Sequence, residues 1–150
     1  MNNIFVYCEI EGGTIADVSL ELLTKGRSLA NQLNCGLEAV VAGNKLDGVK
    51  KQMMPYGVDV LHLFDDERLD PYTSLPHTSI LIKLFEQEKP QIALMGATVI
   101  GRDLGPRVSP WRPLLLLRVD RLGSLRRDTL RSRPHQSSSF FFSYNQQQLL

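Results

Sequence analysis

The sequence predicts an α/β protein: a three-layer α/β/α sandwich with an open, mainly parallel Rossmann-like sheet. Two observations predict this class. Short apolar runs rich in β-branched and aromatic residues alternate with longer segments of helical periodicity. The runs are also almost continuously apolar, as expected of strands covered on both faces. Strands separated by helices pair in parallel through right-handed connections. The alternation stops after residue 109, so we expect a sheet that is incomplete at its C-terminal end.

The first expected elements are a strand, a long helix and a second strand. Residues 4–8 form the first strand, and Glu11-Gly12-Gly13 forms a turn. The helix begins near Asp17 or Thr14, either of which is a candidate N-cap, and it ends near Asn34-Cys35-Gly36. Its apolar residues recur at helical spacing: Val18, Leu22, Leu29 and Leu33. Residues 37–42 form the second strand.

Four further elements complete this alternation. A short helix covers residues 49–53 and is ended by Pro55 and Gly57. The third strand is residues 58–64. The second long helix has Pro76 in its first turn and stops at Lys89-Pro90, and residues 91–96 form the fourth strand. Seven strand residues are expected in the core: Ile4, Val6, Val40, Val60, Leu61, Ile92 and Leu94.

Charge divides the chain into two parts. Residues 1–109 carry 10 Lys and Arg against 14 Asp and Glu, whereas residues 110–150 carry 7 against 2. All basic residues of the second part are Arg. A composition change this abrupt indicates a boundary. We therefore treat 1–109 as an α/β domain and 110–150 as an Arg-rich, low-complexity tail.

The tail does not resemble a domain. Pro110 and Pro113 prevent a helix from continuing through this point. The blocks Leu114–Leu117, 137–139, 140–142 and 146–148 are homopolymeric and cannot specify a packed core. An arginine-rich arm for nucleic acid is one interpretation, but the arginines are scattered and the apolar blocks do not interleave with them. We favour a frameshifted end, and we expect residues 110–150 to be largely disordered or loosely packed, leaving an open sheet edge.

Composition excludes other classes. No apolar run reaches the length of a membrane span, and the N-terminus has no signal-peptide pattern. The two cysteines, Cys8 and Cys35, lie in or beside apolar runs and are expected to be buried and reduced, as in a cytoplasmic protein. We expect the protein neither to bind nucleic acid nor to insert into a membrane.

The segment from residue 92 to residue 108 is the best candidate site. It is predicted as strand, tight loop and helix start, and ligands of open α/β sheets bind outside the carboxyl ends of the strands. Glycines allow close approach of the backbone, and a helix start near Gly101 favours an anion. The candidate residues of this anion or subunit-interface loop are Gly96, Thr98, Gly101, Arg102, Asp103 and Arg107. The structural alternative is that Asp103 caps or complements the helix start and that the arginines form surface ion pairs or a subunit contact.

No other constellation indicates chemistry. The loop has neither the Walker pattern nor G-x-G-x-x-G. His62, His77 and His135 lack metal-ligand spacing. The acidic cluster Asp65, Asp66, Glu67 and Asp70 is more typical of an exposed loop than of a cation site. We therefore expect no catalytic residue and no metal site.

Residues 1–109 resemble the N-terminal domain of electron transfer flavoprotein α subunits. The resemblance rests on Phe5-Val6-Tyr7-Cys8-Glu9, on residues 26–30 and above all on residues 101–108, GRDLGPRV. It implies a heterodimer with a β subunit that carries electrons from flavin dehydrogenases, such as acyl-CoA dehydrogenases, to a quinone-linked acceptor.

The same resemblance implies that the flavin contacts, to FAD, lie mainly in a C-terminal domain that is missing here. We accordingly assign no cofactor-binding residue and expect an electron-carrier fragment that is not an enzyme and binds no FAD by itself. The alternative hypothesis is a stand-alone adenine-nucleotide-binding α/β domain.

Overall fold

The computed structural model describes residues 3–109, 115–119 and 125–126. Its main sheet has the strand order β5-β4-β1-β6-β7-β8, and all neighbouring pairs are parallel except β7 with β8. The strands are β1 (Ile4–Cys8), β4 (Leu37–Gly43), β5 (Val60–Asp65), β6 (Ile92–Gly96), β7 (Leu115–Val119) and β8 (Leu125–Arg126). A small antiparallel hairpin, β2 (Ile10–Glu11) with β3 (Thr14–Ile15), follows β1 and contains the expected turn.

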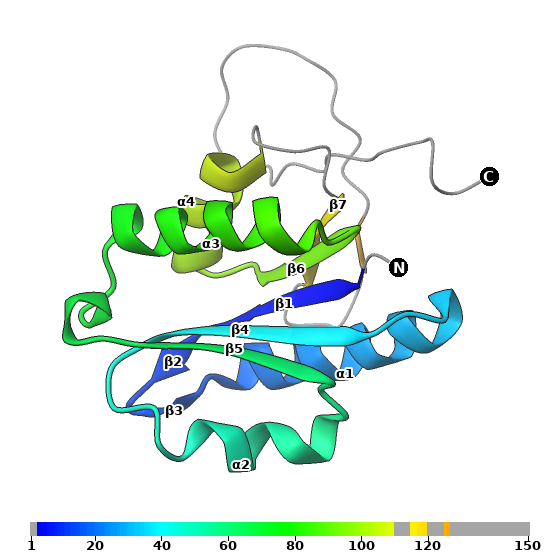
Figure 1. The fold of residues 1–150 in the computed structure, drawn as a ribbon, viewed down its shortest axis with the longest axis horizontal. Coiled ribbons are helices and arrows are strands. Elements are labelled where there is room, and N and C mark those ends of the chain that lie inside the picture. The colour runs from blue at the N-terminus through cyan, green and yellow to red at the C-terminus, as the bar shows by residue number, and fades with distance from the viewer. Residues whose placement is uncertain (1–2, 110–114, 120–124, 127–150) are drawn as a thin grey trace.

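Helices cover both faces of the sheet, as Figure 1 shows. One layer holds α1 (Asp17–Leu33) and α2 (Val49–Met53), and the other holds α3 (Ser74–Glu88) and α4 (Val99–Val108). Two short 3₁₀ helices, η1 (Met54–Tyr56) and η2 (Glu67–Leu69), flank β5. The predicted α/β/α sandwich is therefore confirmed, and α2 has the predicted bounds.

The core consists of two apolar layers, one on each face of the sheet. In β1, the even-numbered residues pack toward α1 and α2: Ile4, Val6 and Cys8. The odd-numbered residues Phe5 and Tyr7 pack toward α3 and α4. This alternation is the period of two that a pleated strand imposes. Of the predicted core residues, Ile4, Val6, Val40, Ile92 and Leu94 are buried.

Val60 was expected in the core and is 43% exposed, so that prediction is wrong. The reason is that β5 lies at the edge of the sheet, where it pairs only with β4. Leu61 packs against the core but is only partly buried. An apolar strand pattern does not reveal whether a strand is central or at an edge.

The sheet continues beyond β6, contrary to the expected open edge. Leu115–Val119 form β7 and pair in parallel with β6, from Ile92 opposite Leu115 to Gly96 opposite Val119. The expectation of disorder is therefore wrong for these residues. Apart from these residues and the two residues of β8, the segment 110–150 lies outside the described part of the chain, so the expectation of disorder is not tested there.

Both predicted caps of α1 are also wrong. Thr14 lies in β3, Asp17 is the first helical residue, and Ala16 occupies the N-cap with no side-chain hydrogen bond. The helix ends as expected: Asn34 has φ of 51°, in the left-handed region that ends many helices. No helix in the described ranges is long and apolar enough to cross a membrane.

Candidate functional site

The chain reverses its direction of travel across the sheet between β1 and β6. It passes from β1 outward through β4 to β5 and then returns to β6 on the other side of β1. The segment after β1 leads to α1 on one face, and the segment after β6 leads to α4 on the other. In open α/β sheets, this switch point at the carboxyl ends of the strands is where ligands bind. The candidate loop after β6 therefore lies at the expected place.

Thr98 organises the loop. It is the N-cap of α4, and its hydroxyl accepts a hydrogen bond from the Gly101 amide at 3.0 Å. The helix begins at Val99, two residues earlier than the expected start near Gly101. Thr98, and not Asp103, therefore caps the helix, so the capping role considered for Asp103 is wrong.

Two glycines make this turn possible. A Cβ atom on Gly101 would lie 2.0 Å from the carbonyl oxygen of Gly96, a distance that no side chain tolerates. A Cβ atom on Gly96 would lie 3.0 Å from a carboxylate oxygen of Glu9. The loop thus brings the backbone of β6 against the first turn of α4, as the sequence predicted for Gly96 and Gly101.

Glu9 completes the switch point, although the sequence analysis did not list it as a site residue. Its carboxylate Oε1 accepts a hydrogen bond from the Thr98 hydroxyl at 2.6 Å, and its backbone amide donates to the Ser19 hydroxyl at 2.8 Å. Glu9 is only 7% exposed. Burial raises the pKa of its carboxyl group above the ordinary value, and the hydrogen bond from Thr98 partly opposes that shift. A charged residue directly after the first strand is the signal that could have identified it.

Asp103 and Arg107 form a second cluster one turn further along α4. The Asp103 carboxylate accepts hydrogen bonds from the Ser74 hydroxyl, from the Tyr72 hydroxyl at 2.6 Å and from Arg107 Nε at 3.0 Å. The hydrogen bonds from Ser74, Tyr72 and Arg107 lower the pKa of Asp103 to about 2. The cluster joins the start of α3 to α4.

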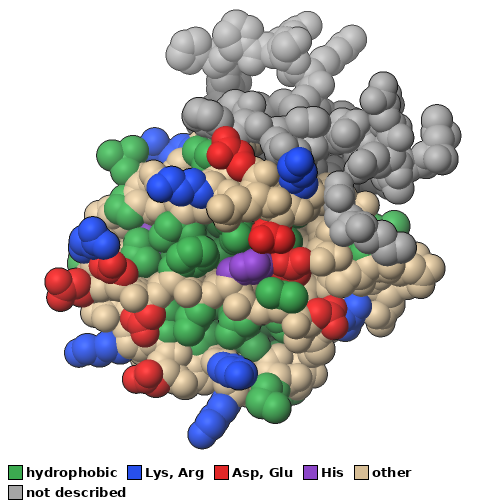
Figure 2. Space-filling view, in the orientation of Figure 1, with side chains coloured by type: hydrophobic (Ala, Val, Ile, Leu, Met, Phe, Trp, Pro, Cys, Tyr) green, Lys and Arg blue, Asp and Glu red, His purple; other side chains and the backbone are tan. Residues whose placement is uncertain are grey.

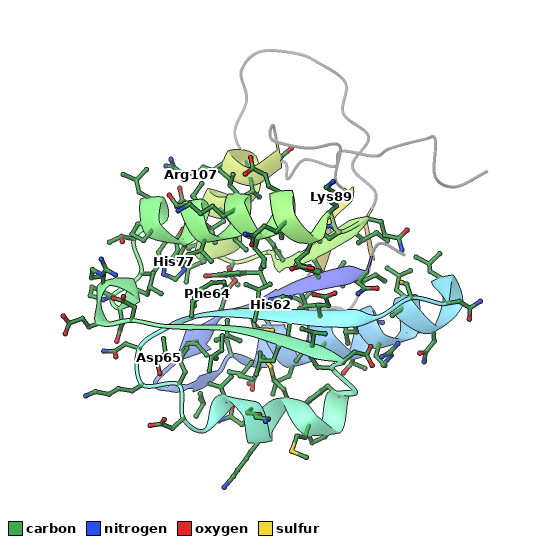
Figure 3. All side chains as sticks on the ribbon, viewed as in Figure 1. His62, Phe64, Asp65, His77, Lys89 and Arg107 are labelled. Atoms are coloured by element: carbon green, nitrogen blue, oxygen red, sulfur yellow. The ribbon has the colours of Figure 1, made fainter. Side chains whose placement is uncertain are left out.

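The predicted ion pair is present for Arg107 but not for Arg102. Arg107 pairs with Asp103 four residues earlier, and Figure 3 shows Arg107 on the layer formed by α3 and α4. Arg102 is exposed, and it forms no ion pair within the described ranges. The six candidate residues therefore fall into two groups: Gly96, Thr98 and Gly101 with Glu9, and Asp103 with Arg107, while Arg102 faces solvent.

His77, in α3, forms a buried link between β1 and η2. Its Nε2 lies 3.1 Å from the carbonyl oxygen of Leu69, and its Nδ1 lies 2.8 Å from the Tyr7 hydroxyl. Because a carbonyl only accepts, Nε2 carries the proton and Tyr7 donates to Nδ1. Burial lowers the pKa of His77. Figure 3 shows His77 between α3 and the sheet, which fits a structural role.

His62 lies on the open edge of the sheet. Its Nε2 is 2.6 Å from the buried carboxylate of Glu38, and its ring centroid lies 5.3 Å from that of Phe5, with the two ring planes tilted by 33°. Figure 3 labels His62 near the centre of the view. Figure 2 has the same orientation and shows a histidine next to acidic side chains and between two apolar patches. His62 and His77 lie in separate clusters.

The acidic cluster after β5 is used in local structure. Asp65 accepts hydrogen bonds from the amides of Lys45 and Leu46, and Asp66 pairs with Arg68. Within the part of the chain that the structure describes, no three His, Cys, Asp or Glu side chains form a group that would hold a metal ion. Asp65 and Asp66 thus have local structural contacts at the end of β5.

The arrangement defines a class of protein: a Rossmann-like α/β domain whose strand-end switch point is occupied by its own side chains. The chain belongs to the electron transfer flavoprotein family, because the model for the electron transfer flavoprotein domain matches residues 4–111. This agrees with the resemblance seen in residues 5–9 and 101–108.

Curated relatives support the same assignment. The chain is 39% identical over 106 residues to Protein FixB of Clostridium saccharobutylicum, covering 71% of this chain and 31% of that protein. It is 36% identical over 106 residues to the electron transfer flavoprotein subunit alpha of Clostridium acetobutylicum, covering 71% and 32% respectively. It is 35% identical over 105 residues to the acryloyl-CoA reductase electron transfer subunit beta of Anaerotignum propionicum, covering 70% and 29%. The chain thus spans about a third of the length of these relatives.

Among solved structures, the fold is similar to that of a universal stress protein in complex with cAMP. The TM-score is 0.50 at 17% sequence identity, and the match covers 79% of this chain and 96% of that chain. At this identity the likeness concerns the fold alone.

Proposed function

We propose that this chain is the N-terminal part of an electron transfer flavoprotein α subunit. In the complete protein it pairs with a β subunit and helps carry electrons from flavin dehydrogenases, such as acyl-CoA dehydrogenases, to a quinone-linked acceptor. The observation that carries the proposal is the family match over residues 4–111, together with relatives named as electron transfer subunits.

Within that protein, we assign the domain a role in scaffolding and subunit contact. The side chains at the switch point are engaged with one another: Thr98 bonds to Glu9 and Gly101, and Asp103 bonds to Tyr72 and Ser74. These contacts hold α3, α4 and the sheet in fixed positions, as a docking scaffold requires. The relatives extend well beyond the matched region, and we propose that FAD is bound by the part that this chain does not match.

Co-expression with a β subunit tests this role. The full 150-residue chain is produced with the β subunit that partners the Clostridium acetobutylicum α subunit, and that full-length α subunit serves as the positive control. We expect a stable complex on size-exclusion chromatography and no flavin absorbance from the chain alone. If the partner is absent from the chain's elution peak at micromolar concentration, the scaffold role is wrong. If the chain purified alone carries stoichiometric flavin, the assignment of FAD to the remainder of the protein is wrong.

The stand-alone adenine-nucleotide-binding domain is the weaker candidate. A nucleotide at the switch point would bring phosphate close to the first turn of α4. That region already contains the Glu9 carboxylate, hydrogen-bonded through Thr98. The proposed subunit role requires no ligand there and is compatible with the carboxylate.

We also propose that residues 110–150 are a frameshifted end and not a native domain, and that the protein acts in the cytoplasm. The change to an arginine-only basic composition supports the first point. The free thiols Cys8 and Cys35 support the second. Reading the coding DNA in all three frames beyond codon 109 tests the frameshift: a second frame that encodes further family sequence is expected, and a stop-rich alternative frame would contradict it.

A further inference from the structure

The start of α4 has the properties of an anion site, but an acidic side chain of the same chain lies beside it. A helix N-terminus presents free amide groups and the positive end of the helix dipole. In α4 the Gly101 amide is bonded to Thr98, and neither the Val99 nor the Ile100 amide has a hydrogen-bond acceptor within the described residues. Glycines at 96 and 101 remove the side chains that would cover this turn.

Glu9 approaches the same turn from the end of β1. Its Oε1 lies 2.6 Å from the Thr98 hydroxyl, which in turn lies 3.0 Å from the Gly101 amide. The carboxylate also packs against the backbone at Gly96, where an added Cβ atom would lie 3.0 Å from Oε1. A continuous chain of contacts therefore runs from the carboxylate to the first turn of the helix.

The carboxylate is more than nine-tenths buried, and it forms no ion pair with a basic side chain of the described residues. Its favourable partners are the Thr98 hydroxyl and the positive end of α4, which are the kinds of group that bind a phosphate. A second anion beside a buried carboxylate meets like-charge repulsion in a region of low dielectric constant.

We propose that the Glu9 carboxylate takes the position of a ligand anion at the switch point and thereby excludes phosphate groups from the start of α4. Glu9 thus determines specificity: it converts the anion site typical of this type of fold into a closed structural contact. The same scaffold without this carboxylate acquires a phosphate site formed by the amides of Val99 and Ile100, while the Gly101 amide stays bonded to Thr98.

Titration with inorganic phosphate tests the proposal directly. The full 150-residue chain is compared with the Glu9→Ala variant at constant ionic strength, and the amide signals of residues 99–101 are followed by heteronuclear NMR. Glu11→Gln is the matched control, because it removes a carboxylate from the hairpin that directly follows β1, where the side chain is exposed and does not contact Thr98. Glu9→Gln keeps the size and the hydrogen-bond acceptor, and it is used if the alanine variant does not fold.

We expect saturable shifts of these amides in Glu9→Ala, with an apparent affinity for phosphate at least about tenfold above that of the unmodified chain. Glu9→Gln should show a smaller gain, and Glu11→Gln none. Saturable binding of equal strength by the unmodified chain overturns the proposal, and so does a folded Glu9 variant that binds no phosphate. The titration requires no β subunit, so its outcome is independent of the proposed subunit role.

Discussion

The Thr98 hydroxyl lies 2.6 Å from the Glu9 carboxylate, although 89 positions separate the two residues in the chain. Glu9 follows the first strand of the sheet, and Thr98 precedes the last long helix of the described region. The contact therefore joins the ends of β1 and β6, the two strands between which the chain reverses its direction across the sheet. The stability of this region should therefore depend on both residues and on the two glycines that allow them to meet.

Thr98→Val should destabilise the domain by roughly 2 to 4 kcal/mol. The substitution removes the α4 cap, worth about 1 kcal/mol, and leaves a buried carboxylate without its donor, at a cost of about 1–3 kcal/mol. Urea unfolding followed by circular dichroism measures the change. Thr98→Ser, which retains the hydroxyl, should stay within about 1 kcal/mol of the unmodified chain. A loss in Thr98→Val no larger than the loss in Thr98→Ser would mean that the hydroxyl stabilises the loop no more than the methyl group does.

Gly101→Ala should be strongly destabilising, by about 3 kcal/mol or more, because the added methyl group would overlap the Gly96 carbonyl oxygen. The helix preference of alanine, about 1 kcal/mol, cannot compensate for this overlap. Thermal unfolding provides the measurement. Gly48→Ala is the control, since the nearest atom to its added Cβ is 3.9 Å away and φ is −87°. A Gly101→Ala protein as stable as the control would show that α4 can shift at little cost.

Glu9→Gln should raise stability at neutral pH relative to the unmodified chain. Burial raises the pKa of Glu9 in the folded state, so the folded protein binds this proton more tightly than the unfolded chain does. The resulting stabilisation is full below the unfolded pKa and is lost as pH rises through the folded pKa. The glutamine variant does not undergo this loss.

Urea unfolding between pH 4 and pH 8 measures this difference in unfolding free energy. The advantage of Glu9→Gln over the unmodified chain should grow with pH and then level off above the folded pKa. Glu11→Gln should show no such trend, because that residue is exposed. A stability difference that stays constant across the range would contradict the shifted pKa.

Asp103→Asn should lower stability at pH 7 by about 1 kcal/mol, allowing for the partial exposure of the carboxylate. The hydrogen bonds from Ser74, Tyr72 and Arg107 lower the pKa of Asp103 to about 2. Its contribution is therefore present above the unfolded pKa of 3.8 and is lost as pH falls through about 2. Unfolding measured from pH 7 to pH 2 should show the two proteins converging at the acid end. Asp47→Asn, at an exposed position, should change little at any pH.

Local sequence patterns were sufficient for most of the elements. The apolar run of β1, the short helix α2 and the stop at Lys89 were all predicted near their observed bounds, because each depends on residues within a few positions. The loop residues Gly96, Thr98 and Gly101 were also identified, since a strand, a glycine turn and a helix follow one another directly. Glu9 was not identified as a site residue, because its partner Thr98 is distant in the chain.

By itself, the sequence determined the fold class, the order of strands and helices, and the family, because hydrophobic periodicity and short motifs are properties of neighbouring residues. Only the tertiary structure decided three further points: that β5 lies at an edge and exposes Val60, that Leu115–Val119 extend the sheet beside β6, and that Glu9 meets Thr98. Each depends on which strands become neighbours. Which strands become neighbours depends on packing across the whole sheet, and it cannot be inferred from the spacing of residues along the chain.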